Sequence, residues 1–251
     1  MKDLRGKNVW VVGASSGIGA ALADELVGRG CRVAISARRR TALDAVSSGR
    51  MHIETVDVES PDEFANTAQR VRQELGSLDV VVFAAGFWEQ MDAGGFDRAL
   101  FARHIEANVM GMANGIAAVL PDMVQQGRGQ IVGISSVAGY RGMPGAQGYG
   151  AAKAAQINLL ESLRCGMRGT GVVVQTVAPG FVETPMTAVN DFPMPFIITA
   201  ERAAKRIADG IARGKAEIVF PFPMMLAMKL ARMIPNAVWP RLFKPQQRAS
   251  A

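Results

Sequence analysis

The chain of 251 residues contains few of the side chains that build metal sites and disulfide frameworks. It has two cysteines, Cys31 and Cys165, and two histidines, His52 and His104. The cysteines lie far apart and lack metal-ligand spacing, so we expect two reduced thiols that face the core of a cytoplasmic protein. Each histidine is isolated and is expected to be structural or solvated. No metal site is predicted.

Long hydrophobic runs are also absent. The longest apolar stretch near the C-terminus, 218–228, is interrupted by Pro221 and Pro223. A membrane-spanning helix needs about 20 apolar residues, so this stretch is not expected to cross a membrane. No secretory signal opens the chain, because residues 1–7 are polar and lead directly into a predicted strand. These features favour a cytoplasmic location.

Acidic residues are the minority, with 22 Asp and Glu against 28 Lys and Arg and a net charge of +6. A basic balance suits nucleic acid, an anionic lipid surface or a phosphorylated cofactor. No nucleic-acid-binding signature is present, and the aromatic residues do not alternate with the basic ones. The excess charge is spread along the chain, with clusters at Arg38–Arg40 and after Lys215. We therefore expect no nucleic-acid partner.

The sequence does contain a regular alternation of short β-branched runs and longer amphipathic segments. Continuously apolar strands that alternate with helices indicate a parallel sheet covered on both faces, and right-handed crossovers make it doubly wound. The prediction is one α/β domain over residues 1–251 with a seven-stranded, mostly parallel sheet. Strands are predicted at 8–12, 32–37, 51–58, 79–84, 129–135, 171–177 and 217–220, and helices at 17–29, from Ser60-Pro61 onward, 96–120, 148–168 and 200–213.

Two segments stand apart from this alternation. Residues 185–198 contain three prolines without a clear period, which indicates a loop or lid over a substrate. Residues 221–251 form an appended, partly helical tail that is rich in Met and Leu and carries several basic residues. Such a tail could cover a neighbouring subunit or the mouth of a site, or lie on a membrane surface. Packing against protein is the preferred interpretation, and peripheral membrane contact is the alternative.

A glycine-rich loop follows the first predicted strand and opens the first predicted helix. Its sequence is Gly-x-x-x-Gly-x-Gly, with Gly13, Gly17 and Gly19. Glycines permit a tight turn and close approach of the backbone to a phosphate, and the helix N-terminus offers free N–H groups to it. Ser15, Ser16 and Ile18 complete the loop. The placement predicts a dinucleotide site rather than a plain strand–helix joint.

The end of the second strand predicts which dinucleotide binds. NAD sites usually carry an acidic residue there, which grips the ribose hydroxyls. Here Ala37 occupies that position and is followed by Arg38, Arg39 and Arg40. An arginine can bind a 2′-phosphate through paired, charge-assisted hydrogen bonds. We expect NADP(H), with Arg38 as the main contact and Arg39 as a second one; a solvated basic turn is the alternative.

A third pattern points to proton transfer. Tyr149 and Lys153 are four residues apart, so on a helix they share one face, and Ser136 precedes the tyrosine by thirteen residues. A phenol is a weak acid–base catalyst at neutral pH, and a nearby cation is expected to lower its pKa. A serine hydroxyl close by could hold a substrate oxygen. Alone, this spacing is equally compatible with a surface Tyr–Lys pair.

Together, and in this order, these motifs resemble the short-chain dehydrogenase/reductase family in its compact branch of about 250 residues, which has a Rossmann-type fold. The resemblance covers residues 6–220. It implies an enzyme whose catalytic tetrad is Asn108, Ser136, Tyr149 and Lys153. It also implies a small-molecule substrate and a homodimer or homotetramer. Cofactor contacts are implied for Gly13, Ser15, Ser16, Gly17, Ile18, Gly19, Arg38, Arg39, Asp57, Val58, Ala85, Gly86, Tyr149, Lys153, Pro179, Gly180, Val182 and Thr184.

Two positions need comment against the family pattern. Ser135 precedes Ser136, and the thirteen-residue gap to the tyrosine selects Ser136. The family usually has two asparagines before Ala-Gly at the end of the fourth strand, where this chain has Phe83 and Ala84. Ala84 cannot make the family's side-chain hydrogen bonds, and we expect water to take that role.

The resemblance implies carbonyl–alcohol interconversion by hydride transfer. Ser136 would stabilise the substrate oxygen and Tyr149 would protonate it, while Lys153 would bind the nicotinamide ribose and lower the tyrosine pKa. Asn108 would hold a water that links Lys153 to solvent. The alternatives are a non-catalytic NADP(H)-binding sensor or scaffold, and a family member with other chemistry such as epimerisation. The substrate pocket is expected to be apolar and formed by Phe87, Trp88, Met91, Val137, Tyr140, Met143, Met186, Phe192, Met194 and Phe196; core or interface packing of these side chains is the alternative.

Overall fold

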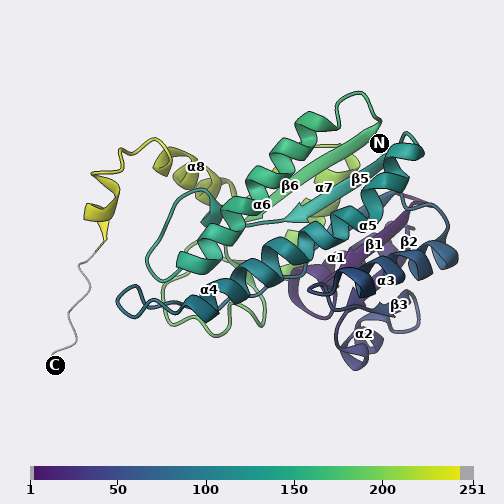
Figure 1. The fold of residues 1–251 in the computed structure, drawn as a ribbon, viewed down its shortest axis with the longest axis horizontal. Coiled ribbons are helices and arrows are strands. Elements are labelled where there is room, and N and C mark those ends of the chain that lie inside the picture. Colours follow the sequence, from purple (N-terminus) through teal and green to yellow (C-terminus); the bar gives the residue numbers. More distant parts are fainter. Residues whose placement is uncertain (1–2, 244–251) are drawn as a thin grey trace.

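A computed structural model describes residues 3–243 of the chain and shows one α/β domain. Its seven-stranded sheet has the order β3-β2-β1-β4-β5-β6-β9, and every neighbouring pair is parallel (Figure 1). The doubly wound topology is as predicted, and the sheet is wholly parallel. The strands are β1 (Asn8–Val12), β2 (Arg32–Ala37), β3 (His52–Thr55), β4 (Val80–Phe83), β5 (Gly129–Ile134), β6 (Val172–Pro179) and β9 (Glu217–Phe220).

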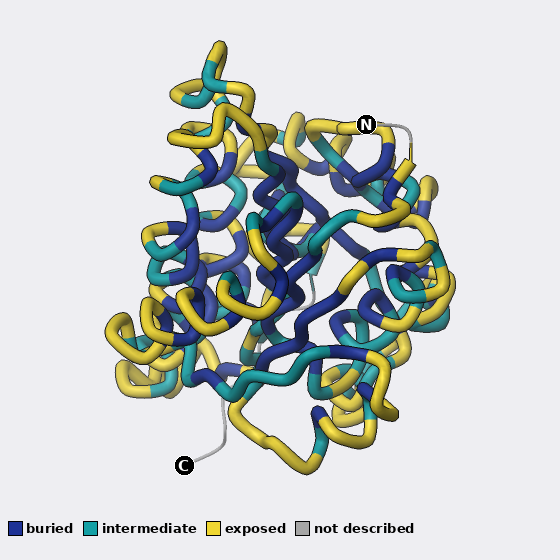
Figure 2. The backbone as a smooth tube through the Cα atoms, turned by 90° about the vertical axis from the view of Figure 1, so that its right-hand side faces the viewer, coloured by how far each residue is buried: buried dark blue, intermediate teal, exposed yellow. Residues whose placement is uncertain are grey.

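Helices cover both faces of this sheet. On one face, α1 and α7 pack over the strands, and on the other α3, α5 and α6 do so. The chain's buried residues lie in the strands and on the inner helix faces, while the outer helix faces are exposed (Figure 2). The helices are α1 (Gly17–Gly28), α2 (Arg40–Ser47), α3 (Pro61–Leu75), α4 (Arg98–Ile105), α5 (Gly111–Gln125), α6 (Gln147–Gly166), α7 (Ala200–Ala212) and α8 (Phe222–Ala231).

The central strands are apolar throughout because successive side chains enter different cores. Val9 and Val11 of β1 lie in the core beneath α1 and α7, whereas Trp10 and Val12 lie in the core beneath α3 and α5. Burial of each such side chain contributes about 1.5–3 kcal/mol. A run without polar alternation is therefore what a strand buried on both faces requires.

Helix signals in the sequence place α3 correctly. The Ser60 hydroxyl accepts a hydrogen bond from the Glu63 backbone N–H at 3.3 Å, and Pro61 is the first helical residue. Elsewhere the elements differ from expectation, most clearly at three places. The third strand ends at Thr55 rather than at 58, α2 is an additional short helix, and the predicted helix 96–120 is divided by a π-helical turn, η1 (Glu106–Met110).

The segment after β6 is partly ordered by a small second sheet. Strands β7 (Val182–Glu183) and β8 (Ile198–Thr199) pair in parallel and bracket the proline-containing loop between them. Beyond β9, the chain continues through α8 to a 3₁₀ turn, η3 (Trp239–Leu242), which stands away from the sheet (Figure 1). Residues 244–251 of the predicted tail lie outside the described residues. Between residues 3 and 243, no helix is long and apolar enough to cross a membrane.

The two cysteines have different environments. Cys31 is buried against the core, as expected, and burial raises the pKa of its thiol to about 11. Cys165 is exposed, so the expectation that it faces the core is wrong. Its position near the end of α6 explains the error, because the last turns of an amphipathic helix present both buried and exposed positions within a few residues.

Candidate active site

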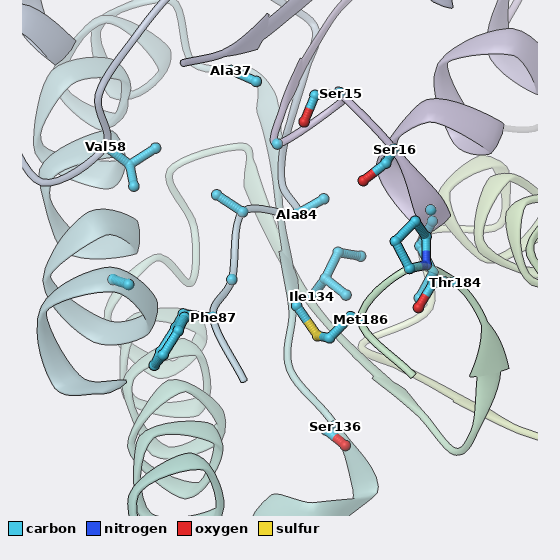
Figure 3. A pocket seen from close by; sticks show the side chains of 18 of the residues that line it. Ser15, Ser16, Ala37, Val58, Ala84, Phe87, Ile134, Ser136, Thr184 and Met186 are labelled. Atoms are coloured by element: carbon cyan, nitrogen blue, oxygen red, sulfur yellow. The ribbon is translucent and has the colours of Figure 1, made fainter. Parts of the chain in front are cut away.

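A cavity of about 500 Å³ lies at the carboxyl ends of the parallel strands. Strand β1 lies between β2 and β4, so the chain changes direction across the sheet at this point, which is where open α/β sheets bind ligands. The cavity wall combines the loop after β1 with the ends of β2, β4, β5 and β6. Figure 3 shows Ser15 and Ser16 across the cavity from Val58 and Phe87, with Ser136 at one end.

Close backbone contacts fix the glycine-rich loop. Gly13 has φ of +90°, and a Cβ there would lie 2.2 Å from the Ala85 backbone nitrogen. A Cβ on Gly19 would lie 2.2 Å from the Gly13 carbonyl oxygen. Ser16 is the N-cap of α1, and its side chain makes no capping hydrogen bond. The first N–H groups of α1 therefore face the cavity edge where a phosphate would bind.

The basic turn after β2 reaches the same cavity. Arg38 and Arg39 line it next to Ala37, whereas Arg40 forms an ion pair with Asp44 at 3.0 Å. Val58 also lines the cavity, as the resemblance implies. Asp57 is not among the cavity-lining residues, and its carboxylate accepts the Glu59 backbone N–H at 3.1 Å. Of the cofactor contacts predicted after β2 and β3, Arg38, Arg39 and Val58 therefore line the cavity, and Asp57 does not.

Ser136 and Tyr149 meet on the cavity wall. The Ser136 hydroxyl lies close enough to the Tyr149 phenol to act on its pKa; it donates to the Pro179 carbonyl at 3.4 Å and accepts the Ala138 backbone N–H at 3.1 Å. The neighbouring Ser135 is 2% exposed, and its hydroxyl donates to the Lys153 carbonyl at 2.8 Å. Ser135 thus fixes the backbone of α6, and Ser136 presents its hydroxyl to the tyrosine.

The electrostatics of Tyr149 differ from the sequence-based expectation. Burial raises the pKa of Tyr149 to about 12, and the hydrogen bond from Ser136 acts in the opposite direction. The Lys153 ammonium nitrogen lies 5.4 Å from the centre of the Tyr149 ring. Burial lowers the pKa of Lys153 to about 7, so the lysine is only partly charged at neutral pH. The Tyr149 pKa is therefore raised rather than lowered, and Lys153 is not among the groups that lower it.

Asn108 lies in the π-helical turn and is fully buried. Its side-chain amide donates to the carbonyls of His104 and Phe87 at 2.9 and 3.0 Å, and its side-chain oxygen accepts the Phe87 N–H at 3.2 Å. It therefore clamps the segment after β4 that lines the cavity. The Asn108 backbone carbonyl accepts the Gln156 side-chain N–H at 2.6 Å.

Sequence reasoning did not identify Gln156. This residue is fully buried, and its side-chain oxygen accepts the Lys153 ammonium at 3.0 Å. The one signal that could have found it is spacing: Gln156 follows Tyr149 by seven residues and Lys153 by three, which places all three on one face of α6.

The remaining cofactor-side residues lie around the same cavity. Ala85, Gly86, Pro179, Gly180, Val182 and Thr184 all line it. A Cβ on Gly86 would lie 3.0 Å from the Asn108 side-chain oxygen, so a larger residue would crowd the buried asparagine. Ala84 replaces the family's asparagine and packs against the apolar core shared by α1 and α7. Its methyl group thus takes part in packing at this position.

The predicted substrate pocket is only partly assembled. Phe87 and Met186 line the cavity, and Trp88 packs edge-on against Tyr149 with ring centres 5.1 Å apart. Three predicted members, Met91, Val137 and Tyr140, are buried, and Tyr140 donates its hydroxyl to Glu217. Met143 packs against the core of Val137 and Tyr140. The Phe192 ring contacts the Phe181 ring in a tilted arrangement, Met194 accepts the Asn190 amide, and Phe196 is exposed. Met91 and Val137 thus pack in the core, whereas Tyr140 and Met143 line a second hollow of the surface.

A doubly wound sheet, a glycine-rich loop at the N-terminus of α1 and a Ser–Tyr–Lys arrangement beside it define a nucleotide-binding oxidoreductase domain. Residues 7–192 match the family model described as short chain dehydrogenase, and the chain belongs to this family. An "Uncharacterized oxidoreductase" from Myxococcus xanthus (strain DK1622) is 38% identical over 246 residues, covering 95% of this chain and 97% of the relative.

Solved structures agree with this assignment. The crystal structure of gox2181 superposes with a TM-score of 0.80 at 22% identity, covering 86% of this chain and 94% of the other, and shows the fold alone. A variant of actinorhodin polyketide ketoreductase, in a crystal structure with NADPH, superposes with a TM-score of 0.78 at 26% identity, covering 88% of this chain and 97% of the other.

Proposed function

We propose that this oxidoreductase uses NADP(H) to interconvert a carbonyl compound and an alcohol. The observation that carries the proposal is that Ser136, Tyr149 and Lys153 line the same cavity as the glycine-rich loop. A hydroxyl donor and a phenol meet there at the place where a substrate oxygen would develop negative charge.

The cavity residues suit a dinucleotide cofactor. Gly13 and Gly19 leave no room for a Cβ. The loop backbone can therefore come close to a pyrophosphate that would bind at the N-terminus of α1. Arg38 and Arg39 at the other end suit a 2′-phosphate, which supports NADP(H) over NAD. The similarity to a ketoreductase with NADPH supports the same choice. When bound, the reduced nicotinamide would supply the hydride.

The roles of the side chains follow from their hydrogen bonds. Ser136 would donate to the substrate oxygen, and Tyr149 would transfer its phenolic proton to that oxygen during reduction. Lys153 would hold the nicotinamide ribose from the buried side of the cavity, where its ammonium already donates to the Ile134 carbonyl at 3.1 Å. Asn108 would keep Phe87 and Gly86 in place. Trp88, packed on the Tyr149 ring, would fix the orientation of the phenol.

The first test is Tyr149→Phe. This variant should bind NADPH as tightly as the wild-type protein and lose turnover by a factor of about 10² or more, because the proton donor is missing. Binding is measured by NADPH fluorescence and turnover by loss of near-ultraviolet absorbance against a panel of ketones and aldehydes. Tyr140→Phe is the matched control, since the Tyr140 hydroxyl is bonded to Glu217 outside the cavity. Wild-type-like turnover by Tyr149→Phe would refute the mechanism, and NADPH binding without turnover of any carbonyl by the wild-type protein would favour the sensor alternative.

The pKa of Tyr149 predicts a direction of the reaction. A phenol with a pKa of about 12 is protonated at neutral pH, so it is ready to act as an acid in reduction but not as a base in oxidation. Alcohol oxidation should therefore accelerate by up to about tenfold for each pH unit above neutrality, whereas reduction should not. Initial rates in both directions across the pH range test this, and oxidation rates that do not change with pH would contradict it.

The substrate is proposed to be a hydrophobic ketone, aldehyde or secondary alcohol. Phe87 and Met186 line the cavity near Ser136, and the loop 185–198 would act as the lid. If short polar ketones were turned over fastest in the carbonyl panel, this assignment would fail. A cytoplasmic location and a homodimer or homotetramer are also proposed, the first from the two free cysteines and the second from the family.

We also propose that the C-terminal tail makes peripheral contact with a membrane. Helix α8 is apolar on two faces: Met224, Met228 and Ala231 are buried, whereas Phe222, Leu226 and Leu230 are exposed, and Met233 just after the helix extends this exposed row. Residues 218–251 contain five basic and no acidic residues; of the basic ones, Lys229 is ion-paired with Glu217, and four remain. Like charges oppose pairing of two such tails and favour an anionic lipid surface. Packing against protein, which is the interpretation preferred from the sequence, therefore describes the inner face of α8.

Vesicle sedimentation separates these outcomes. The wild-type protein should bind phosphatidylcholine vesicles that contain phosphatidylglycerol more tightly than vesicles without it. Leu226→Gln combined with Leu230→Gln should weaken binding by about tenfold, and Val189→Gln on the lid is the control. If the double variant instead halves the mass measured by light scattering and no variant binds vesicles, the outer row is a subunit interface.

A further inference from the structure

The Lys153 amine is connected to Asn108 by a protein side chain. Lys153 donates to the Gln156 side-chain oxygen at 3.0 Å, and the Gln156 side-chain nitrogen donates to the Asn108 carbonyl at 2.6 Å. Gln156 and Asn108 are fully buried, and Lys153 is 4% exposed. The three groups thus form a continuous chain of hydrogen bonds inside the protein, from helix α6 to the π-helical turn.

The orientation of the Gln156 amide is fixed by its neighbours. An ammonium only donates and a carbonyl only accepts, so the amide oxygen must face Lys153 and the amide nitrogen must face Asn108. A reversed amide would place two donors together at one end and two acceptors at the other. In this buried site each of these two contacts would lose its hydrogen bond and leave polar groups without a partner and away from water.

This arrangement changes how Lys153 can exchange protons. A water on the Asn108 carbonyl could accept and release protons, but an amide N–H in that place is a donor that does not ionise at neutral pH. The Gln156 amide therefore cannot itself pass a proton between Lys153 and the Asn108 carbonyl. The amide oxygen nevertheless stabilises the charged form of the lysine, because it accepts a hydrogen bond from the ammonium.

We infer that Gln156 is a positioning residue of the active site: it holds the Lys153 ammonium in place, favours its charged form and occupies the Asn108 carbonyl. The inference rests on the proposed function for its kinetic consequences, whereas the hydrogen-bonded chain itself does not depend on it.

Few groups surround the Lys153 amine, so Gln156 is important for the protonation of this amine. The groups that face it are the Ile134 carbonyl from β5, Gly86 after β4, and Gln156 and Tyr149 from α6. Among these, Tyr149 is the one that titrates, and it is uncharged at neutral pH because its pKa is about 12. Loss of the Gln156 oxygen would leave the Ile134 carbonyl as the acceptor of the ammonium, and the lysine would lose its proton at a lower pH.

Two substitutions should move the same property in opposite directions. Gln156→Leu removes the acceptor and should shift the pH at which NADPH affinity falls to lower values. Gln156→Glu keeps the shape and places a carboxylate next to the ammonium, which should shift that pH upward by about one to three units. The readout is NADPH fluorescence titration from pH 5 to 10 without substrate, followed by kcat over the same range.

A matched control is available in β6. Gln175 is also fully buried, and its amide donates to the carbonyls of Lys215 and Gly210 at 2.8 and 3.2 Å, far from Lys153 in the sequence. Gln175→Leu should lower the melting temperature without moving either pH profile. Gln156→Glu is nearly isosteric and remains informative if Gln156→Leu does not fold.

Opposite shifts for the two Gln156 variants, with Gln175→Leu unshifted, would support the inference. Shifts in the same direction, or profiles identical to the wild-type protein, would overturn it and leave Gln156 as a packing residue. If the wild-type protein turned over no carbonyl, the proposed function would fail, while the fluorescence titration would still decide the role of Gln156.

Discussion

The two ends of the cavity are built in different ways. At the cofactor end, the loop 13–19 is determined by backbone contacts, since a Cβ at Gly13 or Gly19 would lie 2.2 Å from main-chain atoms. At the end proposed to bind substrate, the loop 185–198 is joined to the domain by the short β7–β8 pairing and exposes Val189 and Phe196. Few residue types fit at each position of the loop 13–19, and many fit at each position of the loop 185–198. One fold can therefore keep its cofactor while its substrate changes.

Among the variants that test this difference between the two ends, Gly13→Ala should have the largest effect. The new methyl group would meet the Ala85 backbone, which cannot move without displacing β4, and the φ of +90° is unfavourable for alanine. We expect a loss of about 3 kcal/mol or more in the free energy of unfolding and no measurable NADPH binding. Chemical denaturation and NADPH fluorescence measure the two effects.

Gly28→Ala is the matched control for that variant. Gly28 ends α1, and a Cβ there would meet no atom within 4 Å. Its replacement should leave NADPH binding unchanged and alter the free energy of unfolding by no more than about 1 kcal/mol, in the stabilising direction, because alanine favours helix. Equal losses at both glycines would show that the cofactor end is not determined by close contacts.

A smaller effect is expected where the cofactor end is open to solvent. Arg38→Asp should reduce the preference for NADPH over NADH by about 10- to 100-fold, which corresponds to the roughly 1.5–3 kcal/mol of a charged hydrogen bond. The ratio of kcat/KM values for the two cofactors measures it. Arg50→Asp is the control, because Arg50 is paired with Asp24 at 2.7 Å and does not line the cavity. An unchanged ratio in Arg38→Asp would mean that the basic turn is only solvated.

The sequence predicts the fold well because local and global requirements agree in it. Val9–Val12 is apolar at every position since β1 is buried on both faces, and the Ser60-Pro61 signal is satisfied within one helical turn. The cofactor loop is predictable for the same reason, because its glycines are required by atoms that follow within a few residues or at the adjacent strand end.

The features that the sequence did not predict depend on partners far along the chain. Tyr140 was expected in the substrate pocket, but its hydroxyl is taken by Glu217, 77 residues away. Gln156 acts through Asn108, 48 residues away, and the lowered pKa of Lys153 results from burial that no motif encodes. Spacing can place side chains on one face of a helix, but it does not indicate what lies opposite them.

The smallest effect should come from the lid, at Phe196. This residue has φ of +59°, a conformation that costs a bulky side chain about 1 kcal/mol or more, and its side chain is 57% exposed. Phe196→Gly relieves the backbone strain but increases the freedom of the unfolded chain, so the two contributions nearly cancel and the melting temperature should change by only a few degrees. NADPH affinity should be unchanged, whereas KM for the best carbonyl of the panel should change if the lid contacts substrate.

The contrast with Gly13 is then direct, because both residues have positive φ and only one is packed against the backbone of a neighbouring strand. A loss of stability at Phe196 as large as that at Gly13 would show that the lid is as rigidly determined as the cofactor loop, and the comparison between the two ends would not hold.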